Sequence, residues 1–279
     1  MDLSIEYLGK AVAAPAAIAL LLFVALRKTL PRDLALRYAG PVAFGAAMIA
    51  GCLLTGSVTF VPDRHWHWLP YLAFGASLIG GIAACESLRW FERAVLWLLA
   101  SLVAAWLVVP DWASLSPSRG IWIIALVAGL AVLTASGEFL SVKVPAPTFL
   151  WSLILAATCV AGLIVGFVSL TFGKIAIIPA AALGGCLLGA MIDRTPTVRG
   201  LGLSYAVVIG GWAFVGTVEP QRPVLFLLIA ALAPLALWCC VFGPVSRLRG
   251  WYALLAQTGV VAIVLTIAVA GMVVTVGLP

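Results

Sequence analysis

The chain has 279 residues, of which 64% are hydrophobic and only 9% are charged, and its mean hydropathy is +1.20. This composition excludes an ordinary water-soluble domain. The net charge is +6 at pH 7, but Lys and Arg are scattered through short connections and form no basic stripe. We therefore expect a lipid bilayer as the principal partner and no nucleic acid.

Ten apolar stretches contain no charged residue and no histidine. About 20 apolar residues in a helix cross a bilayer core about 30 Å thick, so each stretch is a candidate crossing. The runs are continuously apolar and lack the alternation of a membrane barrel. The sequence therefore predicts an all-α, polytopic integral membrane helical bundle with about ten transmembrane helices, within a range of eight to ten. In chain order, the predicted spans are 11–26, 39–61, 68–85, 94–110, 120–137, 147–171, 175–192, 200–218, 223–242 and 251–278.

The connections between these spans are short. The longest, 27–38, has twelve residues, which is too few for a soluble domain. Residues 1–279 are thus expected to form a single transmembrane domain, and any activity must take place in the membrane or its headgroup layer.

The distribution of positive residues predicts the orientation. Eleven of the sixteen Lys and Arg residues lie in connections that follow odd-numbered spans. Positive connections are retained on the cytoplasmic side. We expect a plasma membrane protein, in a bacterium an inner membrane protein, with both termini on the outer or periplasmic side.

Prolines and glycines indicate where helices break or approach closely. Pro15, Pro179 and Pro234 are expected to interrupt spans 1, 7 and 9, and proline is also simply common in membrane helices. The small-residue pairs at 162/166 and 185/189 are expected to serve packing within the chain rather than dimerisation.

Three acids directly follow predicted spans on the expected cytoplasmic side: Glu86, Glu138 and Asp193. Glu86 can pair with Arg89, three residues on, if the helix continues there. We assign these acids to a possible substrate pathway, with Glu86 and Glu138 at its mouth. The simpler interpretation is that acids mark span ends because a charge is excluded from the bilayer core.

Two further groups of polar residues are notable. Gln257 and Thr258 form the most polar pair inside a span and are a second candidate for substrate contact, although a hydrogen bond to a neighbouring helix is the favoured interpretation. His65, His67 and Asp63 are weak candidates for a metal site, and a loop in the headgroup layer explains them better. We expect no cofactor and no metal.

A short sequence match between two parts of the chain suggests an internal repeat. Asp63-Arg64 follows span 2 and Asp193-Arg194 follows span 7, which would match if residues 1–143 and 144–279 were two inverted five-helix halves. Inverted repeats are a recurring transporter architecture. Chance is the rival explanation for so short a match.

No catalytic, nucleotide-binding or family motif is present in the sequence. The first hypothesis for function is a permease of a small neutral or lipid-like solute. The alternative is a non-catalytic structural or assembly subunit with membrane protein partners, and a membrane-embedded lipid-modifying enzyme is third.

Overall fold

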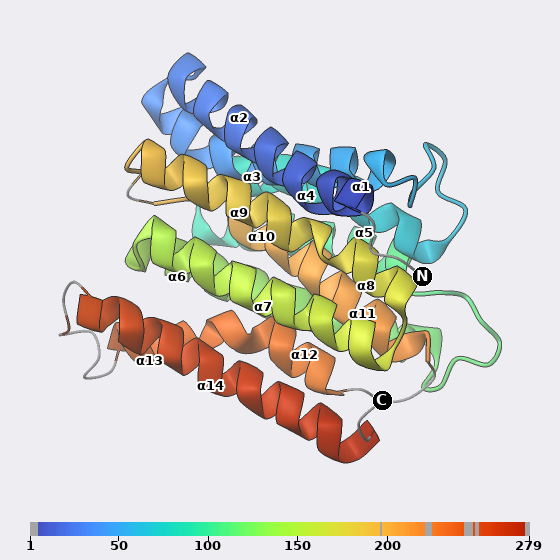
Figure 1. The fold of residues 1–279 in the computed structure, drawn as a ribbon. Helices are drawn as coiled ribbons and strands as arrows, with labels where there is room; N and C mark the ends of the chain where they lie inside the picture. The colour runs from blue at the N-terminus through green and yellow to red at the C-terminus, as the bar shows by residue number, and fades with distance from the viewer. Residues whose placement is uncertain (1–4, 196, 221–224, 243–247, 249–250, 277–279) are drawn as a thin grey trace.

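The computed structural model describes residues 5–195, 197–220, 225–242, 248 and 251–276. These residues form helices and no strand, and nine of the helices are long and apolar enough to cross a membrane. The helices run back and forth between two ends of one bundle, with the start of α1 and the end of α14 at the same end (Figure 1). The prediction of an all-α bundle with helices long and apolar enough to cross a membrane is therefore confirmed.

Ten helical segments make up the described bundle, and several consist of consecutive pieces; η denotes a short 3₁₀ or π segment. The first five are α1–η1–α2 (Ile5–Leu8, Gly9–Ala13, Ala14–Thr29), α3 (Arg32–Leu54), η2–α4 (His65–Trp68, Leu69–Ala83), α5 (Trp90–Val108) and α6 (Arg119–Lys143). The other five are α7 (Ala146–Phe167), α8–α9 (Leu170–Ala176, Ile178–Ile192), α10–η3–α11 (Leu201–Tyr205, Ala206–Gly210, Gly211–Val218), α12–η4–α13 (Leu225–Leu232, Ala233–Leu237, Trp238–Phe242) and α14 (Trp251–Val276).

The difference between ten predicted spans and nine long helices lies at the third span. The predicted stretch 68–85 contains α4, which has only 15 residues. At 1.5 Å per residue it is about 22 Å long, shorter than a bilayer core of about 30 Å. It still runs along the bundle between α3 and α10, so it completes the alternation of the segments.

Two predicted span boundaries were wrong for the same physical reason. α6 continues to Lys143 instead of ending at residue 137, so Glu138 lies inside a helix. The break between the sixth and seventh spans lies at Val168 and Ser169, and Lys174 is inside α8. A helix can extend past its apolar run into the headgroup layer, where charged side chains reach water.

The helix α10–η3–α11 lies at the centre of the bundle. Every residue from Leu201 to Val218 is buried, and the segment packs against α3, α4, α6 and α12. The backbone just before this helix packs closely against α4. A Cβ on Gly80 of α4 would lie 2.1 Å from the carbonyl oxygen of Gly200. Gly200 itself has φ +77°, a left-handed conformation that favours glycine.

The two small-residue pairs differ in whether another helix packs against them. On α9, a Cβ on Gly185 would lie 2.1 Å from the carbonyl oxygen of Ala16, and one on Gly189 would meet the Phe23 ring at 2.7 Å, so this pair brings α9 against α2. On α7, a Cβ on Gly162 or Gly166 would meet nothing within 4 Å, and both residues are exposed. The predicted role in internal packing is confirmed for the first pair and wrong for the second.

The two suggested halves are packed into one bundle. The central helix α10–η3–α11 belongs to the range 144–279, but it contacts α3, α4 and α6 from the range 1–143. The two ranges therefore pack against each other. That they are inverted copies of one five-helix repeat stays a prediction.

Gly80→Ala is expected to destabilise the protein by about 1–3 kcal/mol, because the added methyl group forces α4 away from the backbone at Gly200. The matched control is Gly75→Ala on the same helix, where a Cβ meets nothing within 4 Å. Thermal unfolding in detergent measures both. Equal midpoints for the two variants would contradict this packing.

Candidate functional site

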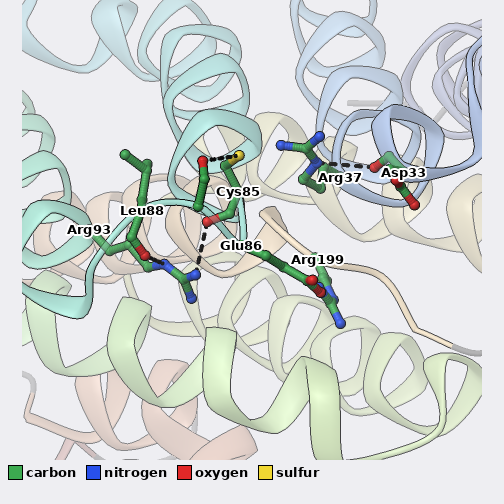
Figure 2. A network of polar contacts seen from close by, with 8 residues as sticks. Asp33, Arg37, Cys85, Glu86, Leu88, Arg93 and Arg199 are labelled. Carbon is green, nitrogen blue, oxygen red and sulfur yellow. Dashed lines mark hydrogen bonds and ion pairs between the residues drawn. The ribbon is translucent and has the colours of Figure 1, made fainter.

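One end of the bundle holds two ion pairs that both involve arginine, and we call it the arginine end. The connections 30–31, 84–89 and 144–145 and the described residues of 193–200 lie at this end (Figure 1). Two ion pairs join them: Arg27 Nε lies 2.6 Å from Asp193 Oδ2, and Arg199 Nη1 lies 2.5 Å from Glu86 Oε1. Figure 2 shows the network around Glu86. The three acids chosen from the sequence thus lie at the same end, as their positions after odd-numbered spans predicted.

Glu86 contacts Arg199, a residue 113 positions further along the chain. The hydrogen bond from Arg199 and its charge hold the pKa of the Glu86 carboxyl below its ordinary value, and Arg37 and Arg93 add to this effect. The expected pairing with Arg89 was wrong because residues 84–89 leave the helix. The Glu86 side chain is 79% exposed, so the pair is screened by water and adds little stability.

Glu138 has a different role, since both of its oxygens bind backbone. Oε2 accepts a hydrogen bond from the N–H of Gly200 at 2.9 Å, and Oε1 accepts one from the N–H of Gly202 at 2.8 Å. These donors belong to the start of α10, where backbone N–H groups have no partner within the helix. A carboxylate there supplies the missing acceptors and interacts favourably with the helix dipole. Glu138 therefore positions the central helix, and it does not lie in a connection as predicted.

Arg93 closes the turn between α4 and α5. Its Nη2 donates to the carbonyl oxygen of Cys85 at 2.8 Å, and its Nε donates to that of Leu88 at 3.2 Å (Figure 2). The Cys85 thiol lies 3.1 Å from the Ser87 hydroxyl. This hydrogen bond is the main reason why the pKa of Cys85 lies below its ordinary value.

Two neighbouring cavities at the arginine end share Arg199. The first, of about 200 Å³, is lined by polar and charged residues: Asp33, Leu36, Arg37, Cys85, Glu86, Ser87 and Arg199. The second, of about 350 Å³, combines charged and apolar walls: Ala83, Ala84, Arg93, Trp97, Ala135, Glu138, Phe139, Val142, Lys143 and Arg199. Glu86 and Glu138 thus face adjoining cavities.

Asp193 stands apart from both cavities. It follows the last residue of α9, and it binds Arg27 and the Thr195 hydroxyl, the latter at 3.0 Å. The hydrogen bond from Arg27 is the first cause of its lowered pKa. Its contacts join α9 to α2, which is a structural role.

The middle of the bundle contains two interrupted helices that meet. η3 is a π segment of five residues between α10 and α11, and η4 is a 3₁₀ segment that contains Pro234. Because proline has no N–H, a carbonyl one turn before it loses its partner. In an α-helix that carbonyl belongs to Ala230. The Tyr205 hydroxyl donates to the carbonyl oxygen of the next residue, Ala231, at 3.1 Å and so adds a hydrogen bond to the same turn. Pro234 thus predicted one interruption, and no sequence signal predicted η3.

An apolar cavity of about 130 Å³ borders this junction. It lies between α6, η3, α11 and α12, and it is lined by Trp122, Ala125, Leu126, Gly129, Leu130, Leu133, Gly210, Phe214, Leu228, Ala231 and Leu232. Among the described residues, the buried Trp122 Nε1 has no hydrogen-bond partner. The other lining side chains are apolar, so the cavity can hold an apolar group.

At the opposite end, which we call the histidine end, the two imidazoles face different acids. His65 Nε2 lies 3.5 Å from Glu219 Oε1, whereas His67 Nδ1 contacts Asp63. Within the described ranges, no group of three or more His, Cys, Asp or Glu side chains could hold a metal ion. The sequence analysis did not select Glu219, because it follows a predicted span on the opposite side from the three selected acids.

Burial governs the protonation of this pair. It lowers the pKa of His65 to about 4, with a smaller contribution from His67. It also raises the pKa of Glu219. His65 is therefore neutral at pH 7, and the contact with Glu219 is not an ion pair between two charged groups.

Gln257 and Thr258 lie on α14, which packs against α7, α12 and η4. Both side chains are partly buried. In the part of the chain that the structure describes, no hydrogen bond or ion pair joins them to Glu86, Glu138 or Asp193. Glu86 and Glu138 line adjoining cavities, and the assignment of all five residues to one pathway stays a prediction.

Glu138→Gln is expected to cost about 1–3 kcal/mol of stability, because an amide offers one acceptor oxygen to two backbone donors and leaves the other unpaired. The matched control is Glu6→Gln, which removes only an exposed contact with Lys10 and should leave the unfolding midpoint unchanged. Thermal unfolding in detergent compares the two. A midpoint for Glu138→Gln equal to that of the control would exclude the capping role.

His65 also predicts a pH dependence of stability. Its folded pKa of about 4 lies below the ordinary 6.5, so between these values the unfolded chain binds the proton and the folded chain does not. Stability should fall as the pH decreases from 6.5 to 4, and this part of the decrease should be absent in His65→Gln. The difference between the two unfolding curves isolates His65 from Glu219 and the other acids. A difference that stays constant with pH would refute the prediction.

The comparisons with known proteins return nothing. No family model, curated protein or solved structure matches this chain. Function must therefore be inferred from the geometry of the bundle itself.

Proposed function

We propose that this protein is a permease for a small neutral or lipid-like solute. The observation that carries the proposal is the contact between two interrupted helices, α10–η3–α11 and α12–η4–α13, beside an apolar cavity in the bundle. Interrupted helices near the membrane midplane are where many transporters place their substrate site. π segments inside helices are also frequent at functional sites.

The depth of the junction supports this interpretation. Gly210, at the end of η3, is nine residues from the start of α10 at Leu201. This corresponds to about 14 Å along the helix, close to the middle of a core about 30 Å thick. The cavity has no ionisable group among its lining residues, which favours a neutral solute over an ion.

α6 connects this cavity to the arginine end. Leu133 lines the apolar cavity, and Ala135, less than one turn further, lines the larger cavity at the arginine end. We infer that this face of α6 forms one wall of the solute pathway, with the charged cavities as its mouth.

One observation favours the second candidate function, that of a non-catalytic subunit in a membrane complex. The small-residue face at Gly162 and Gly166 of α7 is exposed and unused within the chain. Such faces support close helix association in membranes. Purification in mild detergent distinguishes the two functions: a stoichiometric companion protein favours the subunit, and a particle of this chain alone favours the permease.

The permease proposal is tested by filling the apolar cavity. Gly129→Leu places a side chain where the structure has open space, so the protein should fold and solute flux should fall at least about tenfold. Gly120→Leu is the matched control on the same helix, since it is exposed, outside the cavity and equally free of close neighbours. Flux of labelled neutral and lipid-like solutes is measured in vesicles containing each protein. The proposal is wrong if folded protein moves none of these solutes, or if the two variants move them equally.

A further inference from the structure

We propose that the cavity of about 350 Å³ between α4, α5 and α6 binds the phosphate group of an anionic amphiphile, with the chain of that molecule against the apolar walls. This site is separate from the apolar cavity at η3 and η4. The inference does not depend on solute transport.

The charges around this cavity are predominantly positive. Arg93, Lys143 and Arg199 line it, and Glu138 is the one acid among its lining residues. Both oxygens of Glu138 already accept backbone hydrogen bonds from the start of α10. Glu86 contacts a single nitrogen of Arg199 from the neighbouring cavity. A net positive charge therefore remains for a ligand.

The lining also contains hydrogen-bond donors that have no acceptor. Trp97 Nε1 and Arg199 Nε are both buried, and neither has a hydrogen-bond partner among the residues that the structure describes. A buried donor without an acceptor costs free energy and calls for an explanation, such as a ligand. Indole and guanidinium groups can only donate, so the partner must be rich in acceptors. A phosphate group offers several acceptor oxygens and carries negative charge.

The apolar walls indicate that the ligand has a hydrocarbon part. Ala135 lies eight residues before Lys143 on α6, or about 12 Å deeper along the helix. Between them, Phe139 and Val142 line the same cavity. The Lys143 ammonium lies 5.9 Å from the centre of the Phe139 ring, which marks the boundary between the charged and apolar parts. Basic pockets of this kind between membrane helices bind lipid headgroups.

Native mass spectrometry of the protein with phosphatidylglycerol and phosphatidylcholine tests the proposal. The wild type should retain phosphatidylglycerol preferentially. Lys143→Gln should weaken this binding about tenfold, because it removes one positive charge from the cavity. Lys143 is exposed, so the fold should not depend on this charge. Trp97→Phe removes the unpartnered N–H but keeps a ring, and it should weaken binding in the same direction. Lys174→Gln on α8, at the histidine end, is the matched control and should change nothing.

Dodecyl phosphate distinguishes a bilayer lipid from a free amphiphile. A bilayer lipid is identified if the wild type retains phosphatidylglycerol and both Lys143→Gln and Trp97→Phe retain less of it. Thermal stabilisation by dodecyl phosphate with the same variant pattern, but without lipid retention, identifies a free anionic amphiphile. Stabilisation by inorganic phosphate alone would contradict the amphiphile. The proposal is overturned if neither probe binds, or if Lys174→Gln affects binding as much as Lys143→Gln.

Discussion

The whole structure depends on one constraint: inside a bilayer, a backbone N–H or C=O that leaves its helix has no water to bind. At three places where the backbone leaves a regular helix, a specific side chain binds the free backbone groups. The carboxylate of Glu138 binds the first N–H groups of α10, and the hydroxyl of Tyr205 binds the carbonyl of Ala231 before Pro234. Arg93 binds two carbonyls in the connection between α4 and α5. These contacts allow broken helices to exist within an almost charge-free bundle.

The same constraint shapes the polar features that carry the proposals. Glu138 binds backbone donors and forms no hydrogen bond or ion pair with Arg93, Lys143 or Arg199 among the described residues, and these three cations outnumber it around the larger cavity. Where α10–η3–α11 meets α12, Tyr205 binds Ala231, and the neighbouring cavity is lined mainly by apolar side chains. One end of the bundle is therefore suited to an anionic group and its middle to an apolar one.

The sequence predicted the bundle well because a bilayer excludes charge, so hydropathy alone locates most helices. Pro234 predicted an interruption that the structure confirms. The partners could not be predicted, since Glu138 binds a residue 62 positions away and Glu86 pairs with one 113 positions away. Such contacts depend on how helices pack. For the same reason, the sequence could not tell that Gly185 is covered and Gly162 is exposed.

The central claim is that Glu138 and the surrounding helices seal the start of α10 inside the bundle. Amide hydrogen exchange of the wild-type protein in lipid nanodiscs measures this directly, peptide by peptide. The account predicts that residues 200–210 exchange among the slowest in the chain, and far more slowly than the exposed connection 111–118. Exchange of 200–210 at the rate of that connection would contradict the account.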